Sequence, residues 1–194
     1  MLTLDDAKLA DRIRRLSLHG LSRDAWKRYS RAGSWRYDVV ELGYKYNMTD
    51  VAAGIGLGQL EKFGEMQRRR RRLARLYTDH LDGLEAFETP VELPGTTHAW
   101  HLYILRLRPG VLRIGRDELI ERLRERGIGT SVHFQPLHLH SYYRKTLGHR
   151  RGSFPETERQ SARALSLPLY PGLGERRAAR VIEVIEDLVR RYRR

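Results

Sequence analysis

The chain has 194 residues, 40% of them hydrophobic, which is enough to bury one core of ordinary size and excludes a multidomain protein. Its formal net charge is +13, and only five of its 37 basic residues are lysines, so the basicity comes almost entirely from arginine. The absence of cysteine excludes a disulfide framework and a thiolate metal site.

The excess of arginine has two interpretations. Clustered arginines can neutralise nucleic-acid phosphates, but no nucleic-acid recognition motif occurs in the sequence, so we do not expect a nucleic-acid partner. An acidic part of a longer protein could equally balance the charge. The first 16 residues lack the apolar core of a signal peptide, and no stretch approaches the ~20 apolar residues of a membrane span. We therefore predict a soluble, cytoplasmic protein without membrane contact.

The amino-terminal part is predicted to contain one surface helix and one long loop. Residues 5–16 begin with two aspartates and end with arginines, which is the charge order that a helix dipole favours. Residues 20–43 show no periodicity and are predicted to form a loop, and loops of this length are usually functional. Its aromatic residues Trp26, Trp35 and Tyr37 are candidates for stacking on a sugar or a base.

A long helix is predicted from Thr49 or Asp50, either of which can cap it. Its first turns carry small residues that permit close packing, and apolar residues recur at helical spacing as far as Leu84. We interpret the run Arg68–Arg72 as solvated turns of this helix rather than a nucleic-acid or membrane patch.

The chain from about residue 90 onward is predicted to be a compact α+β subdomain. Gly127 is the expected C-cap of its first helix. In chain order, the expected elements are a strand at 99–107, a helix at 117–126, strands at 130–134 and 166–169, and a helix at 175–191.

Four segments together resemble the successive signatures of the DegT/DnrJ/EryC1/StrS aminotransferases. They are GYKYNMTDVAAGIGLGQLEKF at 43–63, HAWHLYILRL at 98–107, RDELIERLRERGIGTSVHFQPLHLHSYYR at 116–144 and SLPLYPGL at 166–173. The resemblance implies the α/β fold of pyridoxal-phosphate-dependent transferases, fold type I, in which a large domain holds the cofactor and a small carboxy-terminal domain closes over it. On this comparison, residues 1–48 are a remnant of the large domain and an interface loop, 49–89 are connecting helices, and 90–194 are the small α+β domain.

The resemblance also implies an activity. Members of this family use pyridoxal 5'-phosphate to transfer an amino group, usually from glutamate, which becomes 2-oxoglutarate, to a keto sugar linked to a nucleotide. We also expect a homodimer in the full-length protein. The segments LSLHGLSRDAW, GYKYN and HFQPLH resemble those of members that aminate C4 of the sugar, such as the 4-amino-4-deoxy-arabinose branch of lipid A modification. Cell-surface polysaccharide, lipid A or related amino-sugar biosynthesis is therefore the expected setting.

No catalytic residue is expected within this chain. The family's Schiff-base lysine precedes a segment that resembles MLTLDD, and none of the five lysines stands in its Ser-x-x-x-Lys-Asn-like context. Since the reaction needs that amine, we expect the isolated chain to be inactive, whether as a truncated product or as one part of a split enzyme. The alternatives are an inert fragment and a non-enzymatic basic protein that retains the small-domain fold and binds nucleic acid or an acidic partner.

Lys45 and Asn47 are the candidate cofactor-binding residues. In an extended segment, residues two apart point to the same side, and a cation with an amide suits a phosphate. In relatives this loop crosses the dimer interface to the partner's cofactor phosphate or substrate. The other interpretation is a solvated lysine and an asparagine that serves the turn before the helix.

His133, His138 and Tyr142 are the candidate substrate-binding residues, because relatives line the nucleotide-sugar cleft with this segment. The other interpretation is a structural role for the histidines and packing under the cleft for Tyr142. Three histidines in eight residues could suggest a metal, but His133, His138 and His140 have no nearby carboxylate in the sequence, so we expect no metal site. Pro168 and Pro171 are expected to shape the subdomain rather than to touch substrate.

Overall fold

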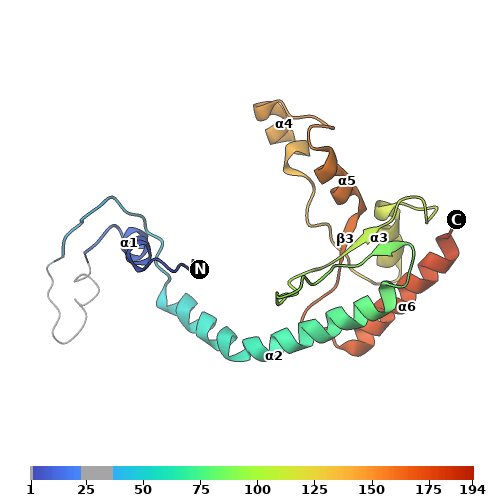
Figure 1. The fold of residues 1–194 in the computed structure, drawn as a ribbon, viewed down its shortest axis with the longest axis horizontal. Helices are drawn as coiled ribbons and strands as arrows, with labels where there is room; N and C mark the ends of the chain where they lie inside the picture. Colours follow the sequence, from blue (N-terminus) through green and yellow to red (C-terminus); the bar gives the residue numbers. More distant parts are fainter. Residues whose placement is uncertain (1, 23–36) are drawn as a thin grey trace. The chain divides into compact units, whose positions relative to one another are not determined.

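A computed structural model describes residues 2–22 and 37–194 of the chain (Figure 1). The stacking predicted for Trp26 and Trp35 concerns residues outside these ranges, whereas Tyr37 is described and half exposed. The chain divides into two compact units, Met1–Glu61 and Lys62–Arg194, and each is described below by itself.

The first unit begins with helix α1, Ala7–Ser17, close to the helix predicted at residues 5–16. Asp6 is its N-cap, because the carboxylate oxygen Oδ1 accepts hydrogen bonds from the backbone N of Lys8 at 2.8 Å and of Leu9 at 3.1 Å. Arg14 and Arg15 lie in the last turn, where positive charge is favourable. The order of acidic and basic residues in the sequence therefore predicted the position of this helix.

After α1, residues 18–22 run antiparallel to residues 38–46. His19 N donates to Tyr44 O at 2.8 Å, and Val40 N donates to Gly20 O at 2.9 Å. A Cβ atom on Gly20, whose φ is +70°, would lie 1.7 Å from Glu41 O, and one on Gly43 would lie 2.1 Å from Gly20 N. The two backbone segments thus approach each other at a distance that only glycine permits. Both ends of the predicted loop are paired rather than irregular.

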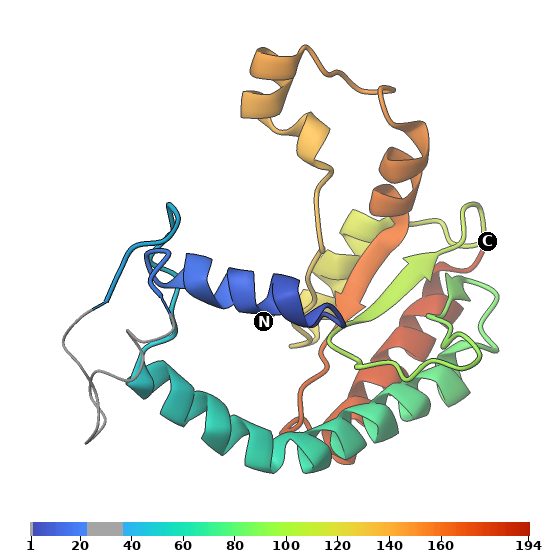
Figure 2. The ribbon, with the colours of Figure 1, turned by 60° about the vertical axis from the view of Figure 1, so that its left-hand side comes forward.

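Helix α2, Asp50–Leu81, is continuous over 32 residues and begins beside Thr49, whose Oγ1 accepts a hydrogen bond from Ala52 N at 3.3 Å. Its carboxy-terminal half belongs to the second unit and buries Leu73, Ala74, Tyr77 and Leu81. Figures 1 and 2 both show this half running beside α6, Glu175–Tyr192. The spacing of apolar residues predicted this buried face.

The sheet of the second unit has three antiparallel strands in the order β1-β2-β3: Phe87–Glu88, Tyr103–Leu107 and Ala164–Leu167. Tyr103, Leu105 and Leu107 alternate inward along β2. The strand predicted at 99–107 starts later, since Trp100 has a φ of 48° and lies outside it. The strand predicted at 130–134 is reduced to one bridge between Ser131 and Ser166, because the chain then leaves the sheet.

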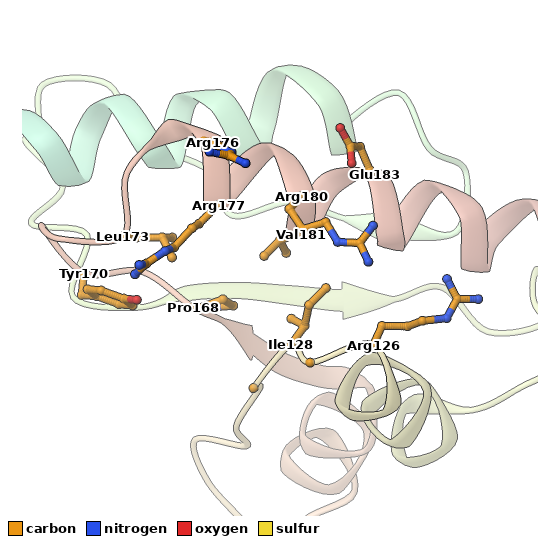
Figure 3. Close-up of a pocket in the computed structure, with 12 residues that line it drawn as sticks. Arg126, Ile128, Pro168, Tyr170, Leu173, Arg176, Arg177, Arg180, Val181 and Glu183 are labelled. Carbon is orange, nitrogen blue, oxygen red and sulfur yellow. The ribbon is translucent and has the colours of Figure 1, made fainter.

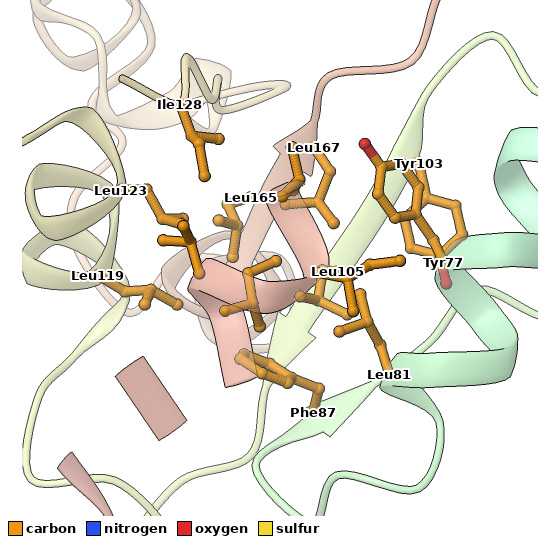
Figure 4. Packing of buried hydrophobic residues seen from close by; sticks show 14 of the residues in the cluster. Tyr77, Leu81, Phe87, Tyr103, Leu105, Leu119, Leu123, Ile128, Leu165 and Leu167 are labelled. Atoms are coloured by element: carbon orange, nitrogen blue, oxygen red, sulfur yellow. The ribbon is translucent and has the colours of Figure 1, made fainter. Parts of the chain in front are cut away.

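The core lies between this sheet and the helices α2, α3 (Arg116–Glu125) and α6 (Figure 4). Leu119 and Leu123 of α3 are fully buried against β3. Tyr77 and Tyr103 pack with ring centroids 5.1 Å apart, and the Tyr77 hydroxyl donates to Pro168 O at 2.9 Å. Burial raises the pKa of both phenols, that of Tyr103 to about 12. The two rings therefore stay neutral in the folded unit at ordinary pH.

Two arginines donate hydrogen bonds to backbone carbonyls at the edges of the sheet. Arg70 Nη1 lies within hydrogen-bond distance of three carbonyl oxygens, those of Trp100 at 3.1 Å, His101 at 3.4 Å and Leu169 at 3.0 Å. Arg116 Nη1 donates to Ser161 O at 3.1 Å and Ala164 O at 2.8 Å. Each guanidinium joins a helix to the segments that flank the strands.

Residues 134–163 form a segment that we call the arm. Its part around residues 141–147 lies away from the sheet in both views, whereas its last residues lead directly into β3 (Figures 1 and 2). It contains the 3-10 turn η2 (Leu137–Leu139), α4 (Ser141–Leu147) and α5 (Pro155–Arg163). No residue of α4 or α5 is fully buried, so neither helix carries the apolar stripe that would have revealed it in the sequence.

Candidate cofactor and substrate site

The paired segment of the first unit holds Lys45 and Asn47 side by side. Lys45 forms a bridge to Leu18, and Tyr46 N donates to Ser17 O at 2.8 Å, which fixes the backbone on both sides of the lysine. The Lys45 ammonium donates to Asn47 Oδ1, so the two side chains share one side as their spacing predicts. The rings of Tyr44 and Tyr46 stack with centroids 5.1 Å apart at an angle of 3°.

This pair has the donors that a phosphate needs. Lys45 is exposed, and no carboxylate among the described residues forms an ion pair with it. The nearby Glu41 lies instead 3.0 Å from Arg12 Nε and 3.5 Å from Arg15 Nε. With its oxygen turned to the lysine, the Asn47 carboxamide keeps its NH2 group as a donor. The pair therefore fits the phosphate end of pyridoxal phosphate, and this is the part of the cofactor that these residues could hold.

His133 lies where the chain leaves the sheet. Its Nδ1 is 2.8 Å from the hydroxyl of Ser166, a buried residue of β3, and its ring meets that of Phe134 edge-on with centroids 4.8 Å apart. Within the described residues, Nε2 has no hydrogen-bond partner. The ring is thus oriented by the sheet while one nitrogen remains available to a polar ligand.

His138 is buried inside the arm, and its Nε2 forms a hydrogen bond with the carboxylate of Glu158. The Nε2 to Oε1 distance is 2.8 Å, and the same carboxylate oxygen accepts from Gly152 N at 2.7 Å. The His138 ring packs on Phe154 with centroids 4.8 Å apart. Since η2 precedes α4 and Glu158 lies on α5, this bond ties the two sides of the arm together.

Tyr142 lies on α4 with 69% of its surface exposed, and its ring meets that of Tyr143 edge-on. His140 is also exposed. In the part of the chain that the structure describes, no three histidine, aspartate or glutamate side chains gather as metal ligands. Lys45 and Asn47 thus belong to the first unit, while His133, His138 and Tyr142 belong to the second.

Sequence analysis missed Ser166 and Glu158, the partners of the two histidines. Ser166 opens the segment SLPLYPGL, so its place in a recognised motif was a usable signal. Glu158 stands among charged residues of a short helix, 20 positions after His138, and nothing in the local pattern distinguishes it. Only the folded arm brings that carboxylate to the imidazole.

The arm is expected to lose stability in acid. The hydrogen bond from His138, with those from the backbone N of Gly152 and Phe154, lowers the pKa of Glu158 below its usual value. A lowered folded-state pKa contributes stability above the unfolded value of about 4.3, and this contribution is lost as pH falls through the folded value. Glu158→Gln should therefore weaken the arm at neutral pH and flatten the loss of stability below about pH 4.

Amide hydrogen exchange of α4 and α5, followed from neutral to acidic pH, measures this effect. Glu121→Gln is the matched control, because Glu121 is an exposed helix residue paired only with Arg124. Equal acid sensitivity of the parent chain and Glu158→Gln would contradict the role given to this bond.

Comparison with known proteins decides the family. Residues 1–186 match the model of the DegT/DnrJ/EryC1/StrS aminotransferase family. The chain belongs to the DegT/DnrJ/EryC1/StrS aminotransferase family. Its fold is accordingly part of the type I fold of pyridoxal-phosphate-dependent transferases, as the sequence resemblance implied.

Among relatives by sequence, the chain is 45% identical to the spore coat polysaccharide biosynthesis protein SpsC of Bacillus subtilis, over 98% of this chain and 49% of SpsC. It is 39% identical to the UDP-4-amino-4-deoxy-L-arabinose--oxoglutarate aminotransferase of Shewanella sediminis, over 97% of this chain and 50% of that protein. The chain thus spans about half the length of these family members.

Solved structures agree with this assignment. The putative sugar aminotransferase Spr1654 of Streptococcus pneumoniae, in its PMP form, matches with a TM-score of 0.80 and 31% identity, over 97% of this chain and 46% of that one. The aminotransferase TlmJ of Streptoalloteichus hindustanus matches with a TM-score of 0.75 and 32% identity, over 97% and 46%. No helix within the described residues is long and apolar enough to span a membrane.

Proposed function

We propose that this chain is part of an enzyme that uses pyridoxal phosphate to transfer an amino group from glutamate to C4 of a keto sugar linked to a nucleotide. The observation that carries the proposal is the Lys45–Asn47 pair, which presents a cation and an amide on a backbone fixed by Gly20 and Gly43. Membership of the aminotransferase family supports the reaction class.

The residues of this chain have binding and orienting roles in the proposal. Lys45 and Asn47 hold the cofactor phosphate by charge and by a directional hydrogen bond. The bound cofactor would supply the electron sink for amino transfer. His133, oriented by Ser166, and the exposed Tyr142 contact the sugar nucleotide. His138 contributes through the arm, because its ring is buried and its Nε2 already holds Glu158.

The proposed class of substrate follows from the names of the relatives. The Shewanella protein is named for a UDP-linked 4-amino-4-deoxy sugar and for oxoglutarate, and SpsC is named for a coat polysaccharide. We therefore propose a 4-keto sugar nucleotide as acceptor, glutamate as donor, and cell-surface polysaccharide, lipid A or related amino-sugar biosynthesis as the setting. We further propose a homodimer in which the Lys45 segment serves the partner's site.

The test uses this chain joined to the half of SpsC that it does not match, assayed with a UDP-linked 4-keto sugar and glutamate. Lys45→Ala removes a charge-assisted contact of about 1.5–3 kcal/mol, so cofactor affinity should fall about tenfold or more. Asn47→Ala should cost less, since a neutral amide makes the weaker bond. Lys8→Ala, another exposed lysine of the first unit, should leave cofactor affinity unchanged.

Mixing two variants tests the arrangement across the dimer. One carries Lys45→Ala, and the other lacks the Schiff-base lysine in the SpsC half. If each site takes these residues from different subunits, mixing restores about one competent site per mixed dimer. Absence of 4-amino sugar product from the parent protein would refute the activity, whereas unchanged cofactor binding in Lys45→Ala would refute only the assignment of this residue.

A further inference from the structure

The backbone of Ser166 is fully paired, which leaves its hydroxyl as the polar group that the sheet does not use. Ser166 N donates to Ser131 O at 2.7 Å, and Ser131 N donates to Ser166 O at 3.2 Å. The residue is 4% exposed, and its hydroxyl oxygen lies 2.8 Å from His133 Nδ1. Among the described residues, His133 is the only hydrogen-bond partner of this hydroxyl.

The fold around the two residues gives their bond a defined geometry. After β3, Pro168 lines a groove beside α6, and its carbonyl accepts the hydrogen bond from Tyr77 (Figure 3). The described residues that line this groove include neither Ser166 nor His133, and its arginines extend in different directions, so they define no single ligand position. The His133 ring itself packs edge-on against Phe134. The strand therefore fixes the hydroxyl, and the hydroxyl and Phe134 together orient the ring.

This bond determines which ring nitrogen of His133 carries the hydrogen. A neutral imidazole has one N–H donor and one acceptor nitrogen, and a hydroxyl has one hydrogen to donate. If Nδ1 carried the hydrogen, it would donate to Ser166, and the hydroxyl hydrogen would then have no acceptor among the described residues. A buried donor without an acceptor is costly. In the favourable arrangement the Ser166 hydroxyl donates to an unprotonated Nδ1, and the ring hydrogen lies on Nε2.

We propose that Ser166 is a positioning residue that holds His133 as the Nε2–H tautomer, so that His133 presents a neutral hydrogen-bond donor to an oxygen atom of the acceptor substrate. This inference rests on the proposed contact between His133 and the sugar nucleotide. An N–H group at Nε2 is satisfied by a carbonyl, hydroxyl or phosphate oxygen, whereas an ammonium group has no lone pair to offer it. Ser166 thereby selects oxygen atoms over amino groups at this position.

Nitrogen NMR of the 194-residue chain with 15N-labelled histidine measures the tautomer directly. Couplings to the carbon-bound ring hydrogens distinguish Nδ1 from Nε2, and His133→Gln identifies the signals of His133. At about pH 8.5, where an ordinary histidine with a pKa of about 6.5 is neutral, we expect a protonated Nε2 and an unprotonated Nδ1. Ser166→Ala should lower the ratio of this tautomer to the other at least about fivefold.

Two further variants separate positioning from packing. Ser166→Thr keeps a hydroxyl on the same strand and should retain the tautomer ratio of the parent chain. Ser161→Ala is the matched control, because the Ser161 hydroxyl donates to Phe134 O at 3.1 Å, and it should leave the ratio unchanged. The comparison of Ser166→Ala with Ser161→Ala is decisive even if the larger threonine disturbs the buried strand. Unchanged melting temperatures establish that each variant is folded.

The kinetic consequence is measured in the protein joined to the SpsC half. Ser166→Ala should lower kcat/KM for the UDP-linked 4-keto sugar about fivefold or more, because His133 then loses its fixed donor. It should leave kcat/KM for glutamate and the affinity for pyridoxal phosphate unchanged. A merely structural role of Ser166 would lower all three quantities together.

Three results would overturn the inference. They are a protonated Nδ1 in the parent chain, the same tautomer ratio in the parent and in Ser166→Ala, and an equal loss of kcat/KM for both substrates. The NMR measurement does not depend on turnover. An inactive joined protein that shows the expected tautomer would therefore refute the proposed transamination and leave the positioning role of Ser166 in place.

Discussion

Tyr77→Ala is expected to lower the free energy of unfolding of the second unit by about 3–5 kcal/mol, as large-to-small changes of core aromatics do. The Tyr77 ring is fully buried, packs on Tyr103 and lies between α2 and the sheet. The substitution also removes the hydroxyl that donates to Pro168 O. Denaturation in urea, followed by circular dichroism, measures the loss.

Tyr77→Phe separates the two contributions. It keeps the ring and leaves only the Pro168 carbonyl without its partner, a cost of about 1–3 kcal/mol. A phenylalanine variant as unstable as the alanine variant would mean that the hydroxyl, rather than ring packing, holds α2 to the sheet.

Gly43→Ala is expected to dismantle the segment that carries Lys45. The added Cβ would lie 2.1 Å from Gly20 N and 2.5 Å from His19 C, and because these are backbone atoms, no side-chain rotation relieves the overlap. The pairing of residues 18–22 with 38–46 must therefore open. In the protein joined to the SpsC half, cofactor affinity should fall at least as far as in Lys45→Ala, about tenfold or more.

Gly83→Ala provides the control for this prediction, since a Cβ on Gly83 meets no atom of the described chain within 4 Å. Equilibrium titration with pyridoxal phosphate compares the two variants. Parent-like affinity in Gly43→Ala would mean that the Gly20–Gly43 contact does not position the lysine.

Elements with a continuous apolar stripe were predictable from the sequence. The helices α2, α3 and α6 begin and end close to the expected residues. Each of them buries one face against the core, in the case of α2 the face of its second half. The arm was not predictable, since Tyr142 and Leu147 of α4 are exposed and no residue of α5 is fully buried, so neither helix shows a periodic apolar pattern. The prediction of a strand at 130–134 was wrong, because the sequence is typical of a strand but only Ser131 pairs with another residue, Ser166.

The candidate site shows the same limit. The Lys45–Asn47 contact follows from the two-residue period of an extended chain, so local spacing was sufficient. The contacts of His133 with Ser166 and of His138 with Glu158 join residues 33 and 20 positions apart. No local pattern encodes such pairs, and the turns between them decide which side chains meet.

The arginines at the sheet margins change the meaning of the net charge. A planar guanidinium can satisfy several carbonyl oxygens at once, as Arg70 and Arg116 do, whereas a lysine ammonium on its flexible stem is a poor substitute. Arg108 and Arg113 likewise donate to backbone carbonyls, those of Phe87 and Arg191. Part of the excess positive charge thus holds secondary-structure elements together. Replacing these arginines with lysine or glutamine would therefore lower the stability of the fold before it affected the binding of any ligand.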